Sequence, residues 1–147
     1  MLRSVLGVIV GYIVMFVVQV IAFMSIYTMM GANWSFKPAS YDPSTSWIAM
    51  QFSVILITAI IAGFICAVIA KGGKAPLVLA VLVLALGLAL AFGSKALRPA
   101  DTHEVRAGNV PNMEAMNKAR PPAWVIFLGP IIGAAGVLIG GKLKRQP

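Results

Sequence analysis

Long apolar stretches alternate along this chain with shorter segments that hold nearly all of its charges. A bilayer core about 30 Å thick takes roughly 20 helical residues to cross. Four stretches reach that length without any Asp, Glu, Lys, Arg or His, at about residues 4–30, 47–70, 75–93 and 123–141. The pattern predicts an all-α fold, a four-helix transmembrane bundle that forms a single membrane domain over residues 1–147.

Composition supports a membrane environment. Hydrophobic residues make up 60% of the chain and charged residues 11%. A soluble domain of this size could not cover so much apolar surface with so few charges. The lipid bilayer is therefore the expected surroundings. The first stretch follows Arg3 as in a signal peptide, but its apolar run is about twice as long as a usual signal core, which favours a retained helix.

Four spans place both termini on one side of the membrane. Six basic residues fall on that side (Arg3, Lys71, Lys74, Lys142, Lys144, Arg145) and six on the other (Lys37, Lys95, Arg98, Arg106, Lys118, Arg120). The first six are denser and lie nearer the span ends, which favours a cytoplasmic location for both termini. All twelve flank apolar spans and no recognition motif accompanies the net charge of +8, so nucleic acid is not an expected partner.

The three tryptophans mark a common boundary on the outer side. Trp34, Trp47 and Trp124 all fall near the outer ends of predicted spans. Indole rings favour the headgroup level, where the ring is half buried and its N–H stays hydrated. We interpret them as interfacial anchors; the alternative is an aromatic cluster that binds a ligand.

The connections between spans carry turn and cap signals. In the outer loop 31–46, Asp42-Pro43-Ser44 favours a turn, and one of Ser44, Thr45 or Ser46 is expected to cap the second span. The inner connection, Lys71 to Lys74, is short enough to make the second and third spans antiparallel neighbours. Pro76 suits the first turn of the third span.

The outer loop 94–122 is the only sizeable polar segment. The sequence predicts one helical turn from Asp101 to Glu104 and another from Asn112 to Lys118, which ends before Pro121. Neither turn is long enough to be stable alone, so the loop is expected to lie over the outer ends of the helices or against a partner.

Small residues recur at four-residue spacing in every span, and such strips allow helices in lipid to approach closely. The predicted packing positions are Gly7, Gly11, Ala59, Gly63, Ala67, Ala85, Ala89, Gly93, Gly129, Gly133, Gly136 and Gly140. The last four form two pairs on different faces, which predicts that the fourth span contacts two neighbours. Pro130 is expected to kink this span.

Uncharged polar side chains also lie within the spans. Gln19 and Gln51 fall in the outer halves of adjacent helices, where they are expected to share a hydrogen bond. Hydroxyls such as those of Thr58 and Ser53 can instead bond to their own helix backbone. The alternative is that Gln19, Gln51, Thr58 and Ser53 line a path for a small neutral solute.

Groups that could perform chemistry are sparse. His103 has Asp101 and Glu104 close by, but neighbouring side chains on a helix point apart and no second His is available. The lone Cys66 lies in mid-span and is expected to behave as a small hydrophobe. We therefore expect no catalytic residues, no metal site and no cofactor.

Ion-coupled transport normally uses an ionisable group at membrane depth, and the four stretches contain no acidic or basic residue. The sequence favours a non-enzymatic accessory or structural subunit of the bacterial inner (plasma) membrane, packed against other membrane proteins or against itself. The first alternative is a small channel or carrier for a neutral solute. The second is a membrane enzyme that uses loop 94–122, with His103 as its acid/base group.

Overall fold

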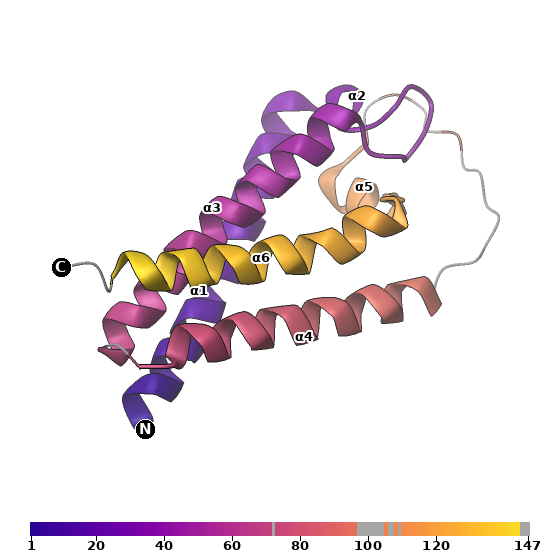
Figure 1. Ribbon diagram of the computed structural model, residues 1–147. Coiled ribbons are helices and arrows are strands. Elements are labelled where there is room, and N and C mark those ends of the chain that lie inside the picture. The colour runs from indigo at the N-terminus through magenta and orange to yellow at the C-terminus, as the bar shows by residue number, and fades with distance from the viewer. Residues whose placement is uncertain (72, 97–104, 106–107, 109, 145–147) are drawn as a thin grey trace.

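A computed structural model describes residues 1–71, 73–96, 105, 108 and 110–144. Its helices follow one another as α1 (Leu2–Met30), α2 (Ala32–Ser35), α3 (Thr45–Ala70), α4 (Ala75–Ala96), α5 (Asn112–Lys118) and α6 (Ala123–Leu143) (Figure 1). The four long helices match the four predicted spans to within a few residues at each end. Each is long and apolar enough to cross a membrane.

The long helices form a bundle with two distinct ends (Figure 1). The start of α1, the α3–α4 turn and the end of α6 lie together at one end, which we call the terminal end. The short helices α2 and α5 lie at the opposite end, the loop end. α3 packs against both α1 and α6, and α6 also packs against α4. Toward the loop end, α1 and α3 lean away from α4.

The α3–α4 hairpin has the predicted geometry. α3 ends at Ala70, and Lys71 adopts the left-handed conformation with φ 53°, from which its N–H reaches the carbonyls of Ala67 and Val68. α4 then begins at Ala75. Pro76 occupies the first turn of α4, where a missing N–H removes no helical hydrogen bond. The two helices are antiparallel neighbours, as expected.

The first loop is closed by hydrogen bonds around Ser44. The Ser44 hydroxyl accepts a hydrogen bond from the N–H of Trp47 at 3.1 Å, which caps α3, and donates to the carbonyl of Trp34 at 2.6 Å. The predicted cap is therefore confirmed and assigned to Ser44. The N–H of Lys37 donates to the carbonyl of Asp42 and completes the turn.

The second loop folds back over the helix ends through α5, which has the bounds predicted for it. The Tyr27 hydroxyl donates to the carbonyl of Val110 at 2.9 Å, and the amide of Asn112 donates to the Thr28 hydroxyl at 3.1 Å. Both bonds tie the segment to α1, so the expectation that this loop covers the helix ends is confirmed for α5. The turn predicted from Asp101 to Glu104 lies outside the described residues.

Candidate functional site: helix faces and a loop-end cavity

Glycines bring α3 and α6 into backbone contact. A Cβ atom added at Gly136 would lie 2.7 Å from the Cβ of Ala59. At Gly63 it would overlap the backbone of Val137, and at Gly140 the carbonyl oxygen of Ile60. Only hydrogen fits at these positions, so the helix axes approach as closely as small-residue packing in lipid allows.

The strip on α1 meets α3 near the terminal end. A Cβ at Gly7 would lie 2.8 Å from the carbonyl oxygen of Cys66, and one at Gly11 would lie 3.1 Å from that of Ala62. Ala67 is buried. Gly7 therefore lies at the α1–α3 interface, and Gly11 lies where α1 meets both α3 and α4, since a Cβ there would also lie 2.8 Å from Leu79.

α6 contacts two neighbours, as the sequence indicated, but its two glycine pairs do not divide between them: of the four glycines, only Gly133 meets α4. A Cβ at Gly133 would lie 3.2 Å from Val83 of α4. Gly136 and Gly140 face α3, and Gly129 has only ordinary contact, with Ile55 of α3 at 3.7 Å. Contact with two neighbours is thus distributed along the whole of α6.

The strip predicted on α4 does not pack against the other helices of this chain. Ala85 and Ala89 are exposed, and a Cβ at Gly93 would have no atom within 4 Å. α4 turns a different face to α6, where a Cβ at Gly87 would lie 2.5 Å from the ring of Pro130. Gly87 is about 200° around the helix from Ala85, since each residue turns about 100°. The Pro130 ring packs against α4 at Gly87, because a residue without a side chain leaves room for the ring.

A second signal in the sequence could have identified this face. Ala80, Gly87 and Ala91 also place small residues near one side of α4, and Gly87 is the glycine closest to the middle of the span. Ala80 and Ala91 are buried. α4 therefore carries small residues on two opposite faces, and only one of them is used within the chain.

The intramembrane polar residues do not converge on one path. The Thr58 hydroxyl donates to the carbonyl of Val54 at 2.8 Å, and the Ser53 hydroxyl donates to that of Ala49 at 2.9 Å. Gln19 and Gln51 do not form the expected hydrogen bond.

An aromatic cluster occupies the loop end. Trp47 lies at its centre, with its ring centroid 6.1 Å from that of Phe23, 6.2 Å from Tyr27 and 6.2 Å from Trp34. The third tryptophan, Trp124, lies apart on α6, where it is 56% exposed and packs against Phe52. Two of the three predicted anchors thus belong to one cluster.

Beside this cluster lies a cavity of about 230 Å³, which we call the loop-end cavity. Its walls include Phe23, Met24 and Tyr27 of α1, Trp47 and Gln51 of α3, and Asn112 of α5. The lining is mainly apolar, with two carboxamides among the aromatic rings. Sequence reasoning noted the aromatic residues but missed the cavity, because the position of α5 that closes it depends on long-range bonds to α1.

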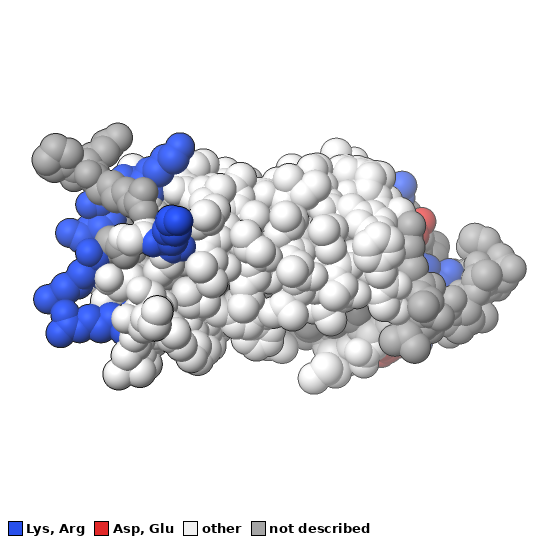
Figure 2. Space-filling view, turned by 60° about the horizontal axis from the view of Figure 1, so that its bottom comes forward, with Lys and Arg blue, Asp and Glu red and all other residues white. Residues whose placement is uncertain are grey.

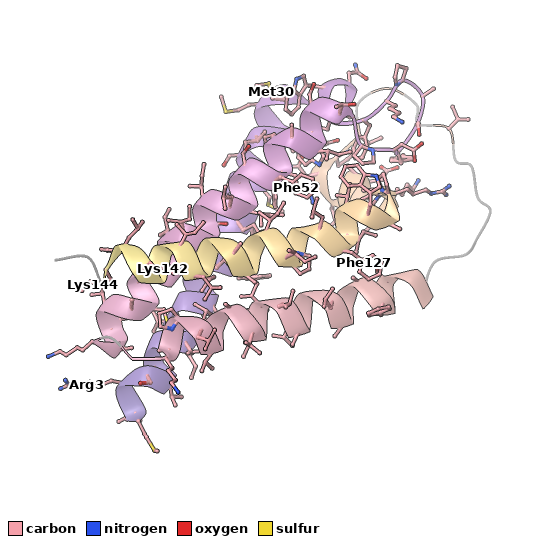
Figure 3. The ribbon with its side chains drawn as sticks, viewed as in Figure 1. Arg3, Met30, Phe52, Phe127, Lys142 and Lys144 are labelled. Carbon is pink, nitrogen blue, oxygen red and sulfur yellow. The ribbon has the colours of Figure 1, made fainter. Side chains whose placement is uncertain are left out.

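The charges are segregated to the two ends of the bundle. Figure 2 shows only basic side chains at the terminal end, basic and acidic ones together at the loop end, and an uncharged surface between them. Arg3, Lys142 and Lys144 all lie at the terminal end (Figure 3) and, like Lys71 and Lys74, are exposed. At the loop end, Lys118 pairs with Glu114 at 3.1 Å.

The groups considered for metal or acid/base chemistry, Asp101, His103 and Glu104, lie outside the described residues. Among the residues that are described, no group of three His, Cys, Asp or Glu side chains is placed to hold a metal ion. Comparison with protein-family models, with curated proteins and with solved structures finds no match to this chain.

Proposed function

We propose that this chain is a non-catalytic subunit of the bacterial plasma membrane that assembles through the outward face of α4. The partner helix belongs to a second copy of the chain or to another membrane protein. The observation that carries the proposal is the exposed strip of Ala85, Ala89 and Gly93, the one predicted small-residue strip that the bundle leaves uncovered.

The physics of association in lipid supports this role. Apolar surface alone does not drive helices together in a bilayer, because lipid tails solvate Leu as well as another protein does. Close packing does drive them together, and it requires small residues in register. The strips on α1, α3 and α6 serve contacts within the chain, where backbones touch. A fourth strip of the same kind on an outward face offers another helix the same close approach.

Charge supports an orientation with both termini in the cytoplasm. Five exposed basic side chains lie at the terminal end, and the acidic residues that the structure describes, Asp42 and Glu114, lie at the opposite end. Basic residues close to span ends are retained on the cytoplasmic side, where the leaflet is also anionic.

Sizing of the protein extracted in mild detergent tests the assembly. We expect a particle larger than a single chain, made of several copies or containing a co-purifying membrane protein. The substitution Ala89→Leu places a bulky side chain on the strip and should reduce the particle to one chain. Ala135→Leu is the matched control, because Ala135 is an exposed alanine on α6. A wild-type protein that is a stable monomer without a partner would overturn the proposal.

A further inference from the structure

The loop-end cavity extends from the helix ends into the apolar part of the bundle. Gln51 lies about six residues into α3, and Phe23 about seven residues before the end of α1. At 1.5 Å per residue, both lie roughly 10 Å from the ends of their helices. Met24, on the cavity wall, is also exposed on the apolar surface of α1. The cavity therefore adjoins the surface that would face lipid.

The size of the cavity suits a ring rather than a water molecule. Its volume of about 230 Å³ exceeds that of the roughly 150 Å³ apolar cavity that accepts benzene. Four aromatic side chains contribute to its walls, namely Phe23, Tyr27, Phe36 and Trp47. Aromatic walls favour a flat ring through stacked or edge-to-face contacts.

One polar group on the wall is left without a partner. The carboxamide of Gln51 makes no hydrogen bond in the part of the chain that the structure describes, although it lines the cavity at membrane depth. In apolar surroundings an amide N–H gains from a carbonyl acceptor. Asn112 differs, because its N–H₂ already donates to Thr28.

The residues that line the cavity carry no charge, so none of them would attract an ionic ligand. The eleven lining residues include no Asp, Glu, Lys, Arg or His. In α5, which contributes to the lining, Lys118 pairs with Glu114. A neutral ligand is therefore favoured over a phosphate-bearing headgroup.

We propose that the loop-end cavity binds the ring of a neutral, membrane-soluble carbonyl compound of the quinone class, and that the amide of Gln51 donates to a ring carbonyl. The aromatic walls hold the ring, and the opening toward the lipid-facing surface of α1 admits it from the bilayer. This binding site is independent of the assembly face on α4, which lies on another helix.

Quenching of tryptophan fluorescence by menadione, a quinone without a long tail, tests the site in phosphatidylcholine nanodiscs. A variant with Trp34→Phe and Trp124→Phe retains only Trp47, on the cavity wall. A variant with Trp34→Phe and Trp47→Phe retains only Trp124, which does not line the cavity. We expect saturable quenching of Trp47 and a linear, collisional response of Trp124.

Two substitutions in the Trp47-only background identify the contacts. Gln51→Leu should raise the half-saturating menadione concentration about fivefold, the loss expected for one hydrogen bond. Gln19→Leu, an amide removed from α1 outside the cavity, should leave it unchanged. Ala115→Leu fills the cavity from α5 and should abolish saturation, which keeps the test decisive if Gln51→Leu does not fold.

Linear quenching of Trp47 equal to that of Trp124 would overturn the proposal, because the cavity would then hold only lipid chains. Saturable binding that is unaffected by Gln51→Leu in a folded protein would overturn the assignment of a carbonyl ligand.

Discussion

At the scale of single residues, the close approach of α3 and α6 depends on glycines, which have only a hydrogen atom where other residues have a side chain. Gly63 and Gly140 lie against the backbone of the opposing helix, at Val137 and Ile60. A contact made by backbone cannot yield as the end of a flexible side chain can. Such positions should therefore tolerate even one methyl group poorly, whereas glycines with space around them should accept it.

The substitution Gly63→Ala tests this. We expect it to lower the free energy of unfolding by about 1–3 kcal/mol, the usual cost of overpacking a close contact. Gly129→Ala is the matched control: its Cβ would lie 3.7 Å from Ile55, an ordinary contact, so stability should stay the same or rise. Unfolding in mixed detergent micelles measures both. Equal stability of the two variants would contradict the backbone contact.

At the scale of elements, α5 is a two-turn helix whose position depends on its attachments. Among the described residues, these include the bond from Tyr27 to the carbonyl of Val110 and that from Asn112 to Thr28. A helix of this length has little stability of its own. Its docking should therefore respond to the loss of one hydroxyl on α1.

The change Tyr27→Phe removes that hydroxyl and keeps the ring. We expect α5 to open more often and trypsin to cleave after Lys118 several-fold faster, because cleavage follows the open population when closing is fast. Tyr12→Phe, which removes a hydroxyl from α1 far from α5, is the control. An unchanged cleavage rate for Tyr27→Phe would show that other contacts hold α5.

The elements could be predicted from the sequence much more completely than their contacts. Apolar length gives the four spans, and local chemistry gives the Ser44 cap, the Lys71 turn and the bounds of α5. Which face of α4 turns inward could not be read in the same way, because both faces carry small residues. The ring of Pro130 on another helix decides it, and the loop-end cavity likewise depends on bonds between distant segments.

At the scale of the whole molecule, charge and apolar surface are arranged along one axis. The terminal end carries basic side chains only, whereas the loop end carries both the described acidic side chains and further basic ones (Figure 2). Between them α1 is the least covered span, with 17% of its most apolar window buried. α1 thus offers the largest exposed share of its length to lipid or to partners.

The orientation has a direct readout. In a Cys66→Ala background, a cysteine that replaces Lys144 should react with a membrane-impermeant maleimide only after the cytoplasmic side is opened. A cysteine that replaces Lys37, an exposed residue of the first loop, should react in intact cells. The reverse pattern would show that the density of basic residues at the terminal end does not set the topology.

Disulfide cross-linking in native membranes tests assembly through α4 most directly. In the Cys66→Ala background, Ala89→Cys places a thiol on the exposed strip, and Ala135→Cys places one on the outward face of α6. Mild oxidation should join the Ala89→Cys protein to a second copy, and a thiol-to-amine cross-linker should join it to a neighbour that lacks a suitable cysteine. The Ala135→Cys protein should remain a single chain under both conditions. Cross-linking no stronger at Ala89→Cys than at Ala135→Cys would contradict the proposal that the α4 face is where this protein assembles.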